Sequence, residues 1–122
     1  MRGRLGAFGM VALLAVLASC AMNPVPGKLD AAQGLYAAEG AYASVLRGAV
    51  AYRELPRCPV SAPVCHDPAV VLRLRGYNTR AVAALHYAEA IVAAKGTAAQ
   101  IEAAVSLASA AVADFSAAIP RR

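Results

Sequence analysis

Two cysteines lie seven positions apart in a proline-rich segment near the middle of the chain. Six residues separate Cys58 from Cys65, and His66 follows the second cysteine directly. This spacing favours a structural disulfide, because thioredoxin-type redox pairs use Cys-x-x-Cys and c-type haem attachment uses Cys-x-x-Cys-His. A zinc site would need a further ligand, and His86 is the only other histidine. We therefore expect a Cys58–Cys65 disulfide and no bound metal or cofactor; a redox dithiol and a metal site are the alternatives.

The residues that could support catalysis are scattered. The chain has no nucleophile elbow, no glycine-rich phosphate loop and no His-Glu-x-x-His motif. His86 is close in sequence to Tyr87 and Glu89, but neighbours at these spacings do not by themselves make a catalytic set. We predict a protein that is not an enzyme, and a cleft that brought His86, Glu89 and a tyrosine together would support the opposite interpretation.

Arginines are concentrated around the cysteine pair. Between positions 47 and 80 there are six arginines and two acidic residues, a local charge of +4. Guanidinium groups bind carboxylates and other anions, so this region could contact an acidic protein or an anionic cell-wall polymer. The alternative is a solvated rim that keeps the protein soluble. The candidate contact residues are Arg53, Arg57, Arg73 and Arg75.

The first twenty residues are typical of an export signal. Arg2 and Arg4 precede an apolar run over residues 5–17, which ends at Leu-Ala-Ser-Cys in positions 17–20. The apolar run is too short for a membrane-spanning helix, and small residues precede the cysteine as at a cleavage site. Residues 17–20 resemble the lipobox of bacterial lipoproteins. The alternative is an ordinary secretory peptide that happens to contain a cysteine.

The resemblance implies how the chain is processed and where it resides. Residues 1–19 would be removed, and the Cys20 thiol would carry a diacylglycerol, usually with a third acyl chain such as palmitate on the new amino group. Two or more acyl chains hold a protein to a bilayer essentially permanently. In enterobacterial relatives an Asp after the cysteine favours the inner membrane. Ala21 therefore indicates the outer membrane, with the domain facing the periplasm.

The remaining chain is long enough for one domain. Residues 20–28, which include two prolines and a glycine, would form a flexible tether, and residues 29–122 the folded domain. Without Arg2 and Arg4 the net charge falls from +5 to +3, which is too mild to predict nucleic-acid binding. Loss of Cys20 to lipid would leave Cys58 and Cys65 as an even pair in an oxidising compartment.

Local signals delimit three helices, at about 29–55, 68–95 and 97–119. Pro56 closes the first, Asp67 and Pro68 begin the second, and Gly96 is expected as its left-handed stop. A capping box from Thr97 to Gln100 begins the third. Short connections make neighbours antiparallel, so we predict an all-α, up-down-up bundle of three helices with a disulfide-closed loop between the first and second.

Each predicted helix has an apolar stripe at spacings of three and four residues. The first stripe is Leu35, Ala38, Tyr42, Val45, Ala49 and Tyr52. The second is Val71, Leu74, Asn78, Ala81, Leu85, Ala88 and Val92. The third is Ile101, Val105, Ala108, Val112, Phe115 and Ile119. Asn78 is the polar exception, which we expect at the edge of its stripe, in contact with water; the alternative is that it fixes register between helices.

Together these features predict a small envelope lipoprotein with a structural or partner-binding role. About 27 helical residues at 1.5 Å each would hold the basic, disulfide-closed tip about 40 Å from the membrane. Apolar surface left over by alanine-rich helices could support a homo-oligomer. The alternative function is a small carrier or inhibitor that binds an apolar ligand or a protein site between its helices, in a groove lined by some of the five tyrosines.

Overall fold

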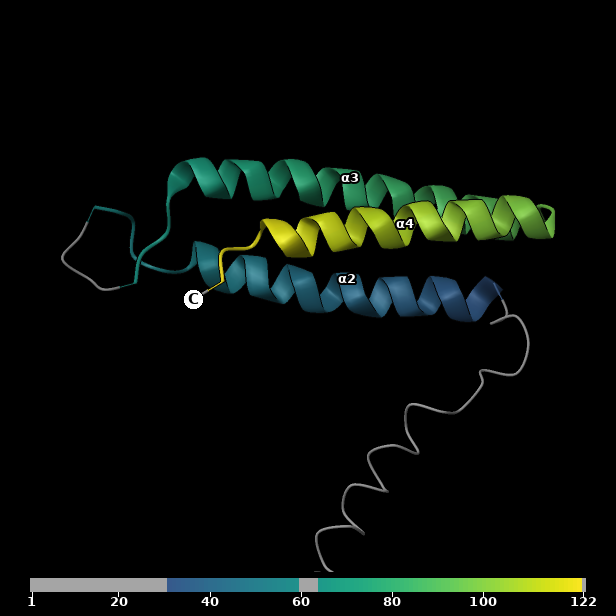
Figure 1. The fold of residues 1–122 in the computed structure, drawn as a ribbon, viewed down its shortest axis with the longest axis horizontal. Helices are drawn as coiled ribbons and strands as arrows, with labels where there is room; N and C mark the ends of the chain where they lie inside the picture. The colour runs from purple at the N-terminus through teal and green to yellow at the C-terminus, as the bar shows by residue number, and fades with distance from the viewer. Residues whose placement is uncertain (1–30, 60–63, 122) are drawn as a thin grey trace, which may run out of the picture.

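The computed structural model describes residues 31–59 and 64–121 and contains three helices packed side by side (Figure 1). They are α2 (Ala31–Arg53), α3 (Pro68–Ala93) and α4 (Ala98–Ala118). Consecutive helices run antiparallel, and α4 contacts both α2 and α3. The predicted three-helix bundle is therefore confirmed. The predicted signal peptide and tether, with Cys20, lie outside the described residues.

The observed helix ends follow from local chemistry. The carboxylate of Asp67 accepts a hydrogen bond from the Ala69 amide at 2.8 Å, and Pro68 takes the first helical position, as predicted. At the start of α4 the predicted capping box is present. The first helix was predicted to reach residue 55 but ends at Arg53. Leu55 precedes Pro56, whose ring disfavours helical backbone in the residue before it.

The end of α3 corrects one prediction. The left-handed residue is Lys95, with φ of 54°, and not Gly96. The Lys95 amide donates to the Val92 carbonyl and the Gly96 amide to the Ile91 carbonyl, both at 3.0 Å, which is the Schellman pattern. Gly96 is needed for a different reason: a Cβ there would lie 2.8 Å from Cγ2 of Ile91.

The core is built mainly from alanine. Within the part of the chain that the structure describes, eleven hydrophobic residues are buried, and six of them are alanines. They come from the three predicted stripes, together with Ala104. Phe115 is the largest fully buried side chain. Because alanine side chains are short, the helix backbones can approach closely, and the stripes are confirmed as the packed faces. The buried residues are Leu35, Ala38, Ala49, Leu74, Ala81, Leu85, Ala88, Ala104, Ala108, Val112 and Phe115.

Asn78 joins two helices, which fits the alternative interpretation of its position, and it is also partly exposed, as expected at the edge of its stripe. Its side-chain oxygen accepts a hydrogen bond from the Tyr42 hydroxyl at 2.8 Å, and both side chains are half-buried. The Tyr42 ring also lies 6.4 Å, centroid to centroid, from Phe115 of α4. A polar pair at this position links α2 to α3 in one register.

Among the described helices, α4 is the one whose length and apolar composition would suffice to cross a membrane. A core helix of a bundle satisfies the same criterion, and α4 buries four residues against its neighbours. Its acidic residues Glu102 and Asp114 are exposed. Each would be costly near a bilayer centre, by about 2.5–3.5 kcal/mol.

The topology separates the two ends of the bundle. At one end lie the last turn of α2, residues 54–59 and 64–67, the start of α3 and the last described residues of α4; we call this the loop end (Figure 1). Ala31 and the turn between α3 and α4 lie at the opposite end. The chain leading back toward Cys20 therefore leaves the bundle at the end away from the disulfide loop.

Exchanging residues in the turn after α3 tests the observed C-cap. Lys95→Gly is expected to raise the free energy of unfolding by about 0.5–1 kcal/mol, because glycine adopts left-handed backbone without a Cβ clash. Gly96→Ala is expected to lower it, because the new Cβ would collide with Ile91. Thermal unfolding followed by circular dichroism measures both changes. A lower unfolding temperature for Lys95→Gly would contradict the assignment.

Candidate functional site

The loop end is organised by the disulfide. Cys58 and Cys65 are bonded, with their Cα atoms 5.3 Å apart, as predicted. Beside the bond, Arg57 and His66 form an isolated parallel β-bridge. The Cys58 amide donates to the His66 carbonyl at 3.0 Å, and the His66 amide donates to the Pro56 carbonyl at 2.8 Å. Arg57 and His66 are thus held next to each other by one covalent bond and two backbone hydrogen bonds.

His66 also ties the loop to α2. Its Nδ1 donates to the Leu55 carbonyl, and its ring meets the Tyr52 ring edge-on, with centroids 6.4 Å apart. The Tyr52 hydroxyl in turn accepts from the Asp67 amide at 2.9 Å. These contacts give His66 a structural role. Within residues 31–59 and 64–121 no three His, Cys, Asp or Glu side chains are grouped so that they could hold a metal ion.

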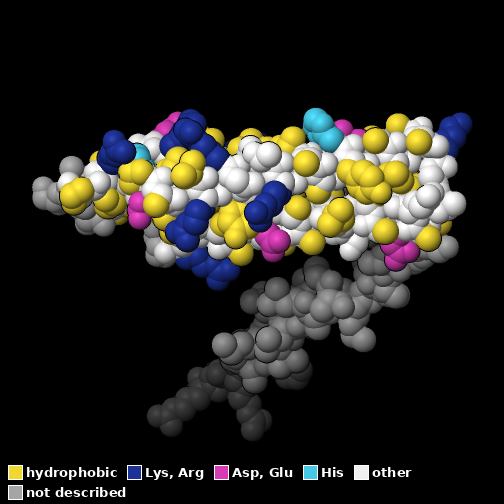
Figure 2. Space-filling view, turned by 90° about the horizontal axis from the view of Figure 1, so that it is seen from above, with side chains coloured by type: hydrophobic (Ala, Val, Ile, Leu, Met, Phe, Trp, Pro, Cys, Tyr) yellow, Lys and Arg dark blue, Asp and Glu magenta, His cyan; other side chains and the backbone are white. Residues whose placement is uncertain are grey.

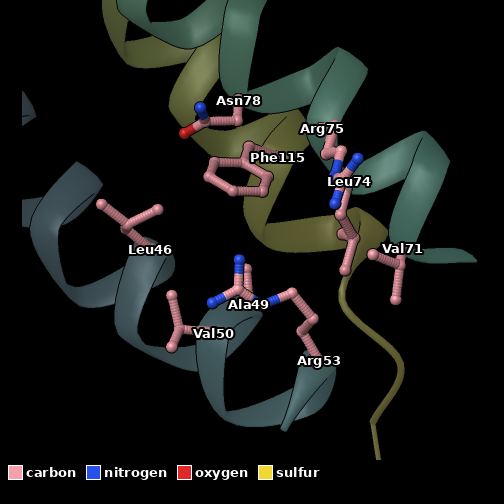
Figure 3. Close-up of a pocket in the computed structure, with 9 residues that line it drawn as sticks. All are labelled: Leu46, Ala49, Val50, Arg53, Val71, Leu74, Arg75, Asn78 and Phe115. Atoms are coloured by element: carbon pink, nitrogen blue, oxygen red, sulfur yellow. The ribbon is translucent and has the colours of Figure 1, made fainter. Parts of the chain in front are cut away.

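A small apolar cavity, which we call the slot, opens between α2 and α3 at the loop end. Figure 3 shows Phe115 of α4 lying between the two helices, with Arg53 of α2 and Arg75 of α3 among the residues around the cavity. The slot has a volume of about 130 Å³. Its lining residues are Leu46, Ala49, Val50, Arg53, Val71, Leu74, Arg75, Asn78 and Phe115.

A wider depression, which we call the basin, adjoins the slot. It has a volume of about 430 Å³ and shares Arg53, Val71 and Arg75 with the slot. Arg57 and His66 border it from the disulfide loop. The other lining residues are Pro68 and Leu72, and the Leu72 side chain is 69% exposed. Slot and basin together form a continuous surface that is apolar inside and basic around its mouth.

Three of the four arginines predicted to contact a partner meet at this surface. Arg53, Arg57 and Arg75 line the basin, whereas Arg73, on the same helix as Arg75, lines neither cavity. The side-chain hydrogen bonds of the described residues involve none of these arginines. Neither Glu54 nor Asp67 lines the basin. Three arginines therefore line one cavity whose lining contains no carboxylate.

Basic side chains gather at the loop end on the face shown in Figure 2. Arg121 belongs to the same end, since α4 returns there (Figure 1). The up-down-up topology already implied its position, because the third helix must end where the first one ends.

The residues that would have indicated catalysis are not assembled at these cavities. His86, Tyr87 and Glu89 are exposed on α3, and none of them lines the slot or the basin. No tyrosine lines either cavity, which removes the groove we had suggested for a tyrosine-bound ligand from this surface. A third groove of about 360 Å³ runs between α2 and α4 and is lined by alanine, serine and valine. Self-association through such apolar surface stays a prediction.

Removing the disulfide tests its contribution to the loop end. Changing Cys58 and Cys65 to serine is expected to lower the free energy of unfolding by roughly 2–3 kcal/mol, because closing this short loop restricts the unfolded chain. Urea unfolding of the full chain in detergent, followed by circular dichroism, measures the loss. Reduction of the unaltered protein should reproduce it. Unchanged stability in both experiments would show that the disulfide does not support the bundle.

Comparison of the chain with protein-family models, curated proteins and solved structures gave no match. The function of the loop end must therefore be derived from its own side chains.

Proposed function

We propose that this protein is a non-enzymatic envelope lipoprotein that binds a partner through its loop end. Acylated Cys20 would hold it to the outer membrane, with the domain in the periplasm. The observation that carries the proposal is that Arg53, Arg57 and Arg75 border one cavity at the end of the bundle opposite Ala31. Ala31, on the side of the chain that leads to Cys20, and the basic surface thus lie at opposite ends of the bundle.

The length of α2 sets how far the basic surface is held from the anchor. Its 23 residues span about 35 Å at 1.5 Å per residue. A partner therefore approaches the loop end away from the bilayer, where the guanidinium groups are accessible to a protein or polymer in the periplasm.

The chemistry of the basin favours an anionic partner. Guanidinium groups form paired, charge-assisted hydrogen bonds with carboxylates and phosphates, and Arg residues exceed Lys in geometric specificity at such contacts. The basin lining contains three arginines, one histidine and no lysine. An acidic periplasmic protein or an anionic cell-wall polymer has the complementary charge.

The carrier interpretation receives less support from the structure. Sites for drug-sized ligands are usually about 300–1,000 Å³ and mostly enclosed by apolar residues. The slot, which has the apolar lining, is smaller, at about 130 Å³, and the larger basin is bordered by arginines. These dimensions favour recognition of part of a larger partner over storage of a free apolar ligand.

Mass spectrometry of the intact protein tests the anchor. Protein extracted from membranes is expected to have the mass of residues 20–122 plus a diacylglycerol and one further acyl chain. Cys20→Ser removes the acceptor thiol, so the variant should lack the lipid mass. A parent protein without added lipid would contradict the anchor, whatever the loop end binds.

Crosslinking in intact cells tests partner binding. Changing Arg53, Arg57 and Arg75 to serine should reduce the yield of the main crosslinked partner severalfold, because these guanidinium groups share the basin. The matched control changes Arg47, Arg73 and Arg80 to serine. This control also removes three positive charges, but from positions on α2 and α3 that line neither the slot nor the basin.

The two variants separate binding from general charge effects. The proposal expects the control to crosslink nearly as well as the parent. An equal loss in both variants would indicate a solvated basic rim without a defined site. No loss in either variant would show that the loop end does not contact the partner.

A further inference from the structure

The slot and the basin are one recognition surface with two chemical parts. Arg53 and Arg75 border both cavities, one from α2 and the other from α3, and Val71 is the third shared residue. The rest of the slot lining is mainly aliphatic and aromatic, and Phe115 of α4 lies between the two helices (Figure 3). Arg57 and His66 line the basin but not the slot. A ligand that fits both parts must itself be amphipathic.

The volume of the slot limits the apolar part of that ligand. A protein cavity of about 150 Å³ lined by Leu, Ile and Phe holds one benzene molecule. The slot, at about 130 Å³, therefore suits one leucine-sized or ring-sized group and is too small for an acyl chain or a steroid. Asn78 is the uncharged polar residue in its lining, and its side-chain oxygen already accepts from Tyr42.

The surroundings of the slot set the charge of the ligand. Arg53 and Arg75 line both the slot and the basin, Arg57 lines the basin, and none of the basin residues is acidic. A polypeptide can place carboxylates within a few ångströms of a bulky apolar side chain. A simple anionic polysaccharide offers the charge but has no comparable group for the slot.

We infer that the loop end binds an acidic peptide segment of a partner protein, anchored by one bulky apolar side chain. The apolar side chain enters the slot between α2 and α3, and flanking carboxylates pair with Arg53, Arg75 and Arg57. This inference rests on the proposed function, which requires only an anionic partner at the loop end. It adds the chemical class of that partner and the position of its anchor residue.

Two synthetic probes test the apolar anchor directly. One is a fluorescent ten-residue peptide with a single leucine among alternating glutamates and glycines, and the other has glycine in place of the leucine. Fluorescence anisotropy with the full chain in detergent, at about 0.15 M salt, measures both affinities. Burial of a leucine side chain should make the first peptide bind roughly 10- to 100-fold more tightly.

Three variants assign the binding to the two parts of the surface. Ala49→Leu fills the slot, so it should remove the difference between the peptides while the glycine peptide still binds. Arg53→Ser with Arg75→Ser should weaken both peptides at least tenfold. Arg47→Ser with Arg73→Ser removes the same charge outside the cavities and should change neither affinity by more than about twofold. Circular dichroism checks that each variant is helical, and the comparison of peptides on the parent needs no variant.

The outcomes distinguish this inference from the proposed function. Equal affinities of the parent for the two peptides would overturn the inference. Dextran sulfate, a polyanion without apolar groups, provides the second arm. If dextran sulfate binding depends on Arg53 and Arg75 but peptide binding does not, the loop end is a general anion site. In that case the proposed function holds, and only the inference that the partner is an acidic peptide is wrong. If no probe depends on these arginines, both the inference and the partner-binding function fail.

Discussion

Close approach of three helices across alanine contacts is the constraint on which this structure depends. Ala81, Ala88 and Ala108 are fully buried, so short methyl side chains fill the contacts between the helices at these positions. Alanine buries little apolar area, and the larger residues, above all Phe115, must supply much of the hydrophobic stabilisation.

At the loop end this pattern of alanine packing has a consequence for binding. Ala49 and Phe115 line the same space between α2 and α3, and the short alanine side chain leaves part of it unfilled. The slot is thus a consequence of the same alanine packing that holds the three helices together.

The disulfide loop completes the surface that the helices begin. Arg53 and Arg75 project from helices whose separation the core determines, but Arg57 and His66 belong to a segment without helical structure. The Cys58–Cys65 bond and the β-bridge hold that segment in place, and contacts of His66 with Leu55 and Tyr52 join it to α2. A loop held rigid in this way loses less conformational entropy when its side chains are ordered on binding. The proposed role of the protein therefore depends on both the helix packing and the covalent closure of the loop.

Local signals were sufficient to predict the helices, and long-range contacts were not accessible from sequence. Asp67, Pro68 and the Thr97–Gln100 box act within one turn, so their positions determine where α3 and α4 begin. The apolar stripes have helical period and identified the packed faces. The hydrogen bond from Tyr42 to Asn78 depends on the register of α2 against α3, which periodicity within one helix cannot give. The same holds for the arginines: Arg73 and Arg75 are two positions apart, but only the rotation of α3 decides that Arg75 reaches the cavities. Lys95 has the left-handed backbone expected of Gly96, and a Cβ at Gly96 would lie 2.8 Å from Cγ2 of Ile91, a packing contact that local sequence signals do not reveal.

The central claim is that the slot and the basin at the loop end, and not basic charge in general, recognise the partner. Titration of the isotope-labelled full chain with the leucine-containing acidic peptide, followed by amide chemical shifts in nuclear magnetic resonance spectra, tests it most directly. The account predicts saturable shifts concentrated at Val50, Val71 and Phe115 and at residues of the disulfide loop. Shifts spread evenly over exposed basic residues, or centred on the alanine-lined groove between α2 and α4, would contradict it.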